Sequence, residues 1–434
     1  MFYSRSYYAH PAVVAVLLFL CPVAMALNVE TGIGVGMGYT DNAALTSANE
    51  EDDWIAEASV GLAITQETGA LTARADAAFS HQNYLNDTYD DQDYLSLSAI
   101  AGWEQIRDRL TWNVRNYFTQ TSIDSLDPDT PDNTQDANVF SFGPDIYWQL
   151  TPRNSLTISP LFQDFYFEDD DTDNQQYGVS AGWLYRMYPT MAVGMDGAVT
   201  DVSYDDEDLN PDYTRSTIQA VISGTRPRSE YTLNLGATHI DRDRYDDHDG
   251  FSGSLDWLYT FTGRSSVRAF VLSDLTDAST GFFNSQVDPD TGDFSNEQVS
   301  GDVLQNNTLR LTYLREGNTL NTRIWTELRD LDYKESPDDR EVQDYGIDLG
   351  YRVSPLLTTG IDGRYTRTEE TDTGGRTDKE YSIGGNVTYQ LSRKLRCNVD
   401  VRYRDNDSTQ SIDEYDEFSV FAGIVYGIGS LRSF

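Results

Sequence analysis

The sequence predicts an all-β fold: a single transmembrane up-and-down antiparallel β-barrel of about 18–20 strands, preceded by a cleaved signal peptide. Three observations carry this prediction. Segments of about ten residues alternate apolar and polar side chains, they come in pairs joined by acidic loops, and short turns link one pair to the next. Successive strand residues point to opposite faces, so each segment has an apolar and a polar face. Lipid outside and water inside a barrel would satisfy both faces.

The first 26 residues predict a secretory signal peptide. Arg5 supplies the positive charge, residues 12–20 form a short apolar run, and Ala24-Met25-Ala26 is a small-residue cleavage site. We therefore expect residues 1–26 to be removed and residues 27–434 to form the barrel. An N-terminal membrane anchor is the alternative, but the apolar run is short for a spanning helix.

The strands follow from the start of the mature chain. A glycine-rich strand near Val29–Tyr39 leads through the acidic loop Glu50–Asp53 into a strand near Trp54–Thr65. In the next strand, Leu71–Phe79, Leu, Ala and Phe alternate with Thr, Arg and Asp. One acidic loop per hairpin gives about ten hairpins and about twenty strands. The later acidic loops are Asp87–Asp93, Asp124–Asp136, Glu168–Asp173, Asp205–Asp212, Asp241–Asp249, Asp274–Asp293, Glu335–Glu341, Glu369–Asp378 and Asp405–Asp416.

The turns between hairpins are short and often carry arginine. Pro and Gly in them supply turn geometry. Bacterial outer-membrane barrels have short periplasmic turns and longer extracellular loops, so we expect the acidic loops outside the cell and the turns in the periplasm. The turns are Glu67–Gly69, Arg107–Arg109, Thr151–Asn154, Arg186–Pro189, Arg226–Arg228, Thr262–Arg264, Arg315–Asn318, Ser354–Pro355 and Ser392–Lys394.

The composition excludes several classes of protein. Lys and Arg number 31 against 71 Asp and Glu, a formal net charge of -40, whereas nucleic-acid binding needs a basic surface. The mean hydropathy of -0.52 is too polar for a helical membrane protein but suits a barrel.

Only Cys21 and Cys397 are present, and Cys21 leaves with the signal, so no intramolecular disulfide is expected. Cys397 alternates in phase with Val399 and Val401, which predicts a lipid-facing position.

The polar strand faces predict the wall of a lumen. Arginines there need water or partners, and acids on corresponding positions favour cross-strand ion pairs. A soluble β-propeller is the alternative, but its strands would need a second packed face. The candidate lumen-lining residues are Arg74, Asp76, Arg115, Arg268, Arg310, Arg323, Glu327, Asp362, Arg364, Arg396, Asp400 and Arg402.

Few residues suggest catalysis or a cofactor. After signal removal the histidines are His81, His239 and His248, and the sequence contains no phosphate-binding glycine loop or zinc-helix motif. We predict no enzymatic activity, and a hydrolase at the barrel rim is the third-ranked function. We also predict no cofactor and no firm metal site. The weak calcium candidates are Asp169, Asp171 and Asp173, which we interpret as parts of a solvated acidic loop, with loose Ca²⁺ binding as the alternative.

The segment Gly34–Leu45 resembles the start of the beta-barrel porin-2 families. These families include barrels associated with exosortase (PEP-CTERM) systems and exopolysaccharide loci, in which a glycine-rich first strand runs into a Tyr-x-Asp-Asn step, here Tyr39-Thr40-Asp41-Asn42. The resemblance implies an outer-membrane channel or export barrel. It supplies no catalytic residues.

We therefore predict an outer-membrane channel for hydrophilic solutes, with a link to exopolysaccharide export implied by the resemblance alone. The alternative is a non-conducting surface barrel whose acidic loops bind divalent cations, lipopolysaccharide or a partner. Expected partners are outer-membrane lipid, lipopolysaccharide and polysaccharide-export components, with no nucleic acid.

The terminal Phe434 resembles the signal read by the barrel-assembly machinery. The mature chain begins its first strand at once, so Asp274–Asp293, the longest loop, is the candidate plug.

Overall fold

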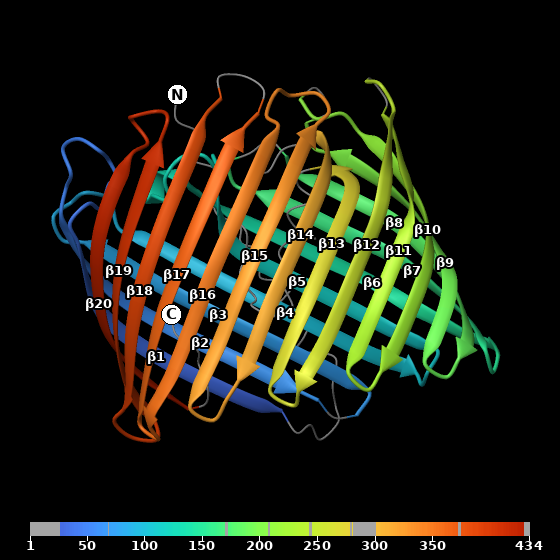
Figure 1. Ribbon diagram of the computed structural model, residues 1–434, viewed down its shortest axis with the longest axis horizontal. Coiled ribbons are helices and arrows are strands. Elements are labelled where there is room, and N and C mark those ends of the chain that lie inside the picture. Colours follow the sequence, from blue (N-terminus) through green and yellow to red (C-terminus); the bar gives the residue numbers. More distant parts are fainter. Residues whose placement is uncertain are drawn as a thin grey trace.

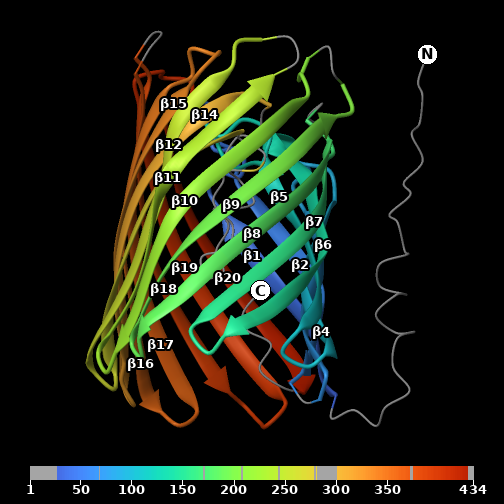
Figure 2. The same cartoon turned by 90° about the vertical axis from the view of Figure 1, so that its right-hand side faces the viewer.

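Twenty antiparallel strands close into one barrel (Figures 1 and 2). The computed structural model describes residues 27–67, 69–169, 172–206, 209–242, 245–277, 280, 301–371 and 375–428. The predicted signal peptide and Phe434 lie outside these residues. Within them, no helix is long and apolar enough to cross a membrane.

The strands are 13 to 18 residues long. The first ten are β1 (Asn28–Thr40), β2 (Asp53–Gln66), β3 (Leu71–Tyr84), β4 (Gln92–Ile106), β5 (Leu110–Ser122), β6 (Thr134–Thr151), β7 (Asn154–Phe167), β8 (Asn174–Tyr188), β9 (Met191–Tyr204) and β10 (Tyr213–Arg226). The other ten are β11 (Ser229–Arg242), β12 (His248–Thr262), β13 (Ser265–Asp277), β14 (Val303–Glu316), β15 (Leu320–Tyr333), β16 (Arg340–Ser354), β17 (Leu357–Glu370), β18 (Thr377–Gln390), β19 (Leu395–Ser408) and β20 (Tyr415–Ile428).

The first and last strands close the barrel. Strand β1 pairs with β2 on one side and with β20 on the other, from Thr31↔Ile428 to Thr40↔Ser419. On the inner side of this seam the Phe421 ring lies over Gly36, where a Cβ atom would come within 2.1 Å of the ring. The predicted all-β barrel of 18–20 strands is confirmed, with twenty.

The connections alternate between two ends, as the sequence predicts. Short turns join β2 to β3 and each later even-numbered strand to the next, and the acidic loops join each odd-numbered strand to its successor. All acidic loops therefore lie at one end, which we call the loop end. The loop between β5 and β6 carries a short 3-10 helix, Pro131–Asn133.

The outer face of the barrel is apolar and carries aromatic residues near both ends. On β18 the exposed residues Tyr381, Ile383, Val387 and Tyr389 alternate with inward-facing residues. Tyr381 and Tyr389 are eight residues apart, which is about 26 Å along a strand and about 20 Å after the usual tilt. Cys397 pairs in register with Tyr389 on this outer face.

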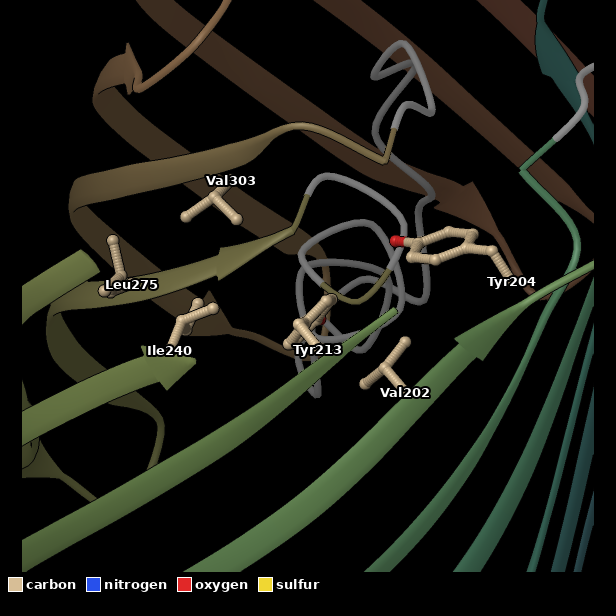
Figure 3. Close-up of a cluster of buried hydrophobic side chains, with 6 residues drawn as sticks. All are labelled: Val202, Tyr204, Tyr213, Ile240, Leu275 and Val303. Carbon is tan, nitrogen blue, oxygen red and sulfur yellow. The ribbon is translucent and has the colours of Figure 1, made fainter. Parts of the chain in front are cut away.

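At the loop end, the tip of the β13–β14 hairpin leaves the wall and turns inward. The β12–β13 register stops at Gly253↔Ser273, although β12 itself begins at His248. Beyond Ser273 the hairpin packs on the inner side of its neighbours: Leu275 and Val303 are fully buried against Ile240 of β11 (Figure 3). We define the β13–β14 tip as residues 274–277 and 303–306.

Candidate functional site

The predicted lumen residues lie on the strand face opposite the exposed apolar side chains. Alternation with outward residues such as Ile324, Ile361 and Val399 places them on the inner wall. They come from seven strands: Arg74 and Asp76 from β3, Arg115 from β5, Arg268 from β13, Arg310 from β14, Arg323 and Glu327 from β15, Asp362 and Arg364 from β17, and Arg396, Asp400 and Arg402 from β19.

Several of these residues form ion pairs between adjacent strands. Arg310 and Glu327 stand directly opposite each other on β14 and β15 and are hydrogen-bonded. Arg268 binds Asp256 of β12 through two nitrogens, at 2.6 and 2.9 Å. Cross-strand pairs of opposite charge stabilise a sheet and hold both side chains in place. This part of the inner wall is therefore an ordered array of charges.

The array continues over β15–β19. Arg323 binds Asp348, its register partner on β16, at 2.5 Å. Arg402 on β19 reaches across β18 to Asp362 on β17, at 3.1 Å. Gly384, the β18 residue between them in register, has no side chain to block this contact.

Arg364 makes a further two-point contact, diagonally with Asp344 of β16, at 2.8 and 2.9 Å. Nearby, the Trp325 ring lies over the backbone of Gly346, and the Arg323 guanidinium sits 4.6 Å from the ring centre. A hollow of about 520 Å³ opens beside these groups, with Asp362 and Arg364 in its wall. Such a wall offers donors, acceptors and an aromatic edge to a polar solute.

The other predicted residues lie elsewhere on the inner wall. Arg74 pairs with Asp76 on the same strand at 2.8 Å, and both side chains are largely exposed. Asp400 accepts a hydrogen bond from Asn398 at 3.1 Å. Arg115 projects from β5, and Arg396 lines a small hollow next to the β1–β20 seam with Phe421.

The loop between β5 and β6 crosses the loop end of the barrel. We call residues 123–133 the strap. Its ends join the far wall in Figure 1, whereas β16, β18 and β20 form the near wall. Arg376, just before β18, donates to the Leu126 carbonyl at 2.5 Å, and Arg340 of β16 donates to the Ser125 hydroxyl at 2.5 Å. This loop, Asp124–Asp136, is one of the acidic loops that the sequence predicts, and these two arginines hold it across the mouth.

Arg376 lies in a compact cluster of charges. Its guanidinium contacts Asp378 at 2.7 Å, Asp413 at 3.1 Å and Asp127 of the strap at 4.0 Å. Burial raises the pKa of Asp413 above the ordinary aspartate value, against the opposing effect of Arg376, and Asp127 raises it further. The cluster thus concentrates carboxylates around one buried cation.

The β13–β14 tip is held on the opposite part of the mouth. Arg215 of β10 binds both carboxylate oxygens of Asp274, at 2.6 and 2.7 Å. The Tyr213 hydroxyl donates to Asp277, and Gln176 of β8 donates to the Thr280 hydroxyl at 2.8 Å. The start of the predicted plug Asp274–Asp293 therefore does turn inward, while residues 281–293 lie outside the described part of the chain.

Two of the three weak calcium candidates make hydrogen bonds within the protein. Asp173 accepts the Phe167 amide at 2.7 Å, and the Asp169 amide donates to Gln135 at 3.1 Å. Asp171 lies outside the described residues. Among the residues that the structure describes, no group of three or more metal-binding side chains occurs.

The histidines pair with carboxylates. His81 contacts Asp93 at 2.8 Å and His239 contacts Asp249 at 3.0 Å, each pair formed by register partners at the loop end of a hairpin. Alternation places both pairs on the outer face, in phase with Phe79 and Phe251.

No sequence pattern predicted the roles of Arg340, Arg376 or Arg215, and Asp274 was predicted only as the first residue of the candidate plug. Their partners are distant in sequence, up to 250 residues for Arg376 and Leu126. One signal was present: Arg376 is a basic residue within a loop that is otherwise acidic.

The fold and the charged inner wall define a porin-like β-barrel of the bacterial outer-membrane type. Residues 304–427, from β14 to β20, match the family model described as "Putative beta-barrel porin 2". The predicted resemblance is thereby confirmed, although the match falls on the last strands instead of the first. No curated protein matches the chain.

Solved outer-membrane structures show similar folds at low identity. The FrpB iron transporter from Neisseria meningitidis is 9% identical, with a TM-score of 0.49, covering 92% of this chain and 81% of that one. The outer membrane protein opdK from Pseudomonas aeruginosa is 10% identical, with a TM-score of 0.39, covering 92% and 99%. The siderophore receptor PirA from Pseudomonas aeruginosa is 11% identical, with a TM-score of 0.45, covering 93% and 80%.

Proposed function

We propose that the barrel is a channel that passes hydrophilic solutes across the outer membrane. The observation that carries this proposal is the inner wall of β12–β19, where arginines and carboxylates alternate from strand to strand. A wall of this kind stabilises water and polar solutes inside the barrel, and its charges tune which ions enter. The proposal assigns no catalytic residue and no cofactor.

Planar-bilayer conductance of the purified protein tests the channel. We expect discrete conductance steps, and an electrically silent bilayer at high protein load would refute the proposal.

The ion selectivity of the channel gives a sharper test. Asp362→Asn removes a negative wall charge and should move the reversal potential in a KCl gradient toward anions, whereas Arg402→Gln should move it toward cations. Equal shifts of the same sign in both variants would show that these residues do not line the path.

Export of a polysaccharide is a narrower version of the proposal. It is supported only by the resemblance to barrels of exopolysaccharide and exosortase loci, and polysaccharide-export components would then be partners. Deleting the gene in its native host should reduce secreted polysaccharide while leaving its synthesis intact. Unchanged secretion would exclude polysaccharide export and would leave the proposal of a general channel standing.

A non-conducting surface barrel is the second candidate. The strap and the β13–β14 tip both occupy the loop end, which favours a narrow or closed mouth. In this function the acidic loops would bind Ca²⁺, lipopolysaccharide or a partner at the cell surface. A rise in melting temperature on adding millimolar Ca²⁺, together with silent bilayers, would favour it over the channel.

A further inference from the structure

The hydrogen-bond ladder of the wall is interrupted between β6 and β7. The register of these strands stops at Phe142↔Phe162 and resumes at Ile146↔Ile158 with the same alignment, so three residues of each strand face each other without a regular ladder. In the other strand pairs of the described residues, register shifts occur only next to a turn. We call the six residues of this interruption the seam gap: residues 143–145 and 159–161.

Two prolines explain the seam gap. Pro144 and Pro160 lie directly opposite each other at its centre, as the unchanged alignment requires. Proline has no N–H group, so neither residue can donate to the carbonyl of the other, and both hydrogen bonds of this pair are lost. The ladders on their other sides continue, with Trp112↔Pro144 towards β5 and Pro160↔Val179 towards β8. The prolines therefore weaken the β6–β7 pair alone.

The seam gap lies in the part of the wall that faces lipid. Phe140 and Trp148 are on the outer face of β6, four residues from Pro144 on either side. Strands β6 and β7 are neighbours in Figure 2. The paired residues that bound the gap are four positions apart, which is about 13 Å along a strand. Because lipid offers no water to replace a backbone bond, intact ladders resist separation, and this gap is the point of least resistance.

The gap is closed in this structure by side-chain bonds and by close contact. Gly143 lies against the Pro160 carbonyl, since a Cβ atom on this glycine would come within 2.1 Å of the carbonyl oxygen. On the inner face, Asp145 accepts a hydrogen bond from the Ser159 hydroxyl at 2.5 Å and one from the Asn113 side chain at 2.7 Å. We call the Asp145–Ser159 bond the latch. Asp145 is exposed, so water can replace Ser159 when the strands separate.

On the outer face, aromatic rings tie each strand of the pair to its other neighbour. Phe142 of β6 stacks on Trp112 of β5 with 5.4 Å between ring centres, and Phe162 of β7 contacts Tyr177 of β8 at 5.1 Å. One ring contact crosses the pair, from Phe140 to Phe162 at 6.4 Å, on the loop side of the gap. Separation at the seam gap leaves the first two contacts in place.

We propose that the seam gap is a lateral opening through which a single-chain amphiphile passes between the lumen and the membrane. Its inner side carries the polar groups of Asp145 and Asn113, and its outer side carries aromatic rings and faces lipid. The head group stays in the polar lumen while the alkyl chain enters lipid, and one chain is narrow enough to pass between two strands. The inference goes beyond the axial channel because this path crosses the wall.

Transfer of a fluorescent lysophosphatidylcholine across liposome membranes tests the opening on the full-length barrel. The probe occupies both leaflets, and albumin, which is too large to enter the barrel, extracts what reaches the outside. We expect wild type to release the inner-leaflet probe that protein-free vesicles retain. P144V/P160V supplies the missing N–H donors and should lose this transfer with unchanged uptake of a neutral disaccharide. P355V, at an exposed proline in the β16–β17 turn, is the control and should keep both activities.

A reversible cross-link tests the same gap without changing the prolines. In a C397S background, D145C/S159C places cysteines opposite each other on β6 and β7, where a disulfide replaces the latch. Oxidation should stop transfer of the probe, and reduction should restore it to at least the wild-type rate. S180C/A198C is the matched control, because these register partners lie on the inner face of the continuous β8–β9 ladder. It should transfer the probe in both states.

The outcomes decide the lateral opening and the axial channel separately. Transfer that persists in folded P144V/P160V and in oxidised D145C/S159C would overturn the lateral opening, as would a wild type that releases no more probe than protein-free vesicles. Conductance and disaccharide uptake decide the axial channel in either case. Probe transfer by an electrically silent barrel would support the lateral opening alone. If P144V/P160V folds poorly, the cross-link decides.

Discussion

At the residue scale, the ion pairs of the inner wall depend on small residues beside them as well as on the charged groups. Arg323 contacts both Asp348 and the face of Trp325, and the Trp325 ring needs the bare backbone of Gly346 beneath it. The glycine is therefore part of the site although it carries no functional group. Its role is steric, because a methyl group at this position would occupy the space of the ring.

Substituting Gly346 with alanine should destabilise the barrel by about 1–3 kcal/mol, as overpacking does. A Cβ atom there would lie 1.9 Å from the nearest Trp325 ring atom. Gly350→Ala on the same strand is the matched control, because its nearest neighbour, the Asn321 Cβ, is 3.9 Å away. Urea unfolding in lipid vesicles measures both variants; equal losses of stability would contradict the steric explanation.

At the element scale, the strands divide into regular wall segments and ends that leave the wall. Most strands keep one register along their length, whereas β13 separates from β12 beyond Ser273. What holds the freed hairpin end is a small apolar core, in which Ile240, Leu275 and Val303 are fully buried. Two ion-paired groups, Arg215 and Asp274, fix its position.

Leu275→Ala should loosen the β13–β14 tip, since truncating a fully buried leucine costs about 2–5 kcal/mol. Val271→Ala on the same strand is the control, because Val271 is exposed on the outer wall. Hydrogen exchange of the β13 amides reports the effect: those beyond Ser273 should exchange faster in the leucine variant alone. Unchanged exchange there would show that other contacts hold the tip.

The sequence predicts the strands of the barrel wall and their two faces, but it does not predict the contacts that hold the loops at the mouth. The two-residue period and the turn chemistry are local, so the number of hairpins and the faces of Arg323 or Val399 follow from neighbouring residues. The strap contacts join residues 215 and 250 positions apart, and no local pattern encodes such pairs. Loop composition predicted a solvated segment because the arginines that hold it belong to other hairpins.

At the scale of the whole molecule, the two ends differ in character. The loop end carries acidic segments, two of which turn inward, and the other end carries turns of a few residues. Aromatic residues such as Tyr381 and Tyr389 stand near the two edges of the apolar outer band. This asymmetry leads us to expect a single orientation, with the loop end outside the cell.

Cysteine labelling on intact Gram-negative cells tests that orientation. In a C397S background, Ile412→Cys in the β19–β20 loop should react with a membrane-impermeant maleimide, and Arg153→Cys in the β6–β7 turn should react only after the outer membrane is broken. Both side chains are exposed, so burial does not bias the comparison. The reverse pattern would invert the orientation and place the strap at the periplasmic mouth.

The seam between β1 and β20 bears on how the molecule is made. Phe421 rests on Gly36, yet these two residues come from opposite ends of the chain and meet only through the β1–β20 register. Until the last strand has been synthesised, β1 keeps one unpaired edge, and such edges invite wrong partners. Closing the barrel therefore requires both ends of the chain, and the Phe421 ring meets Gly36 only when β1 and β20 pair in this register.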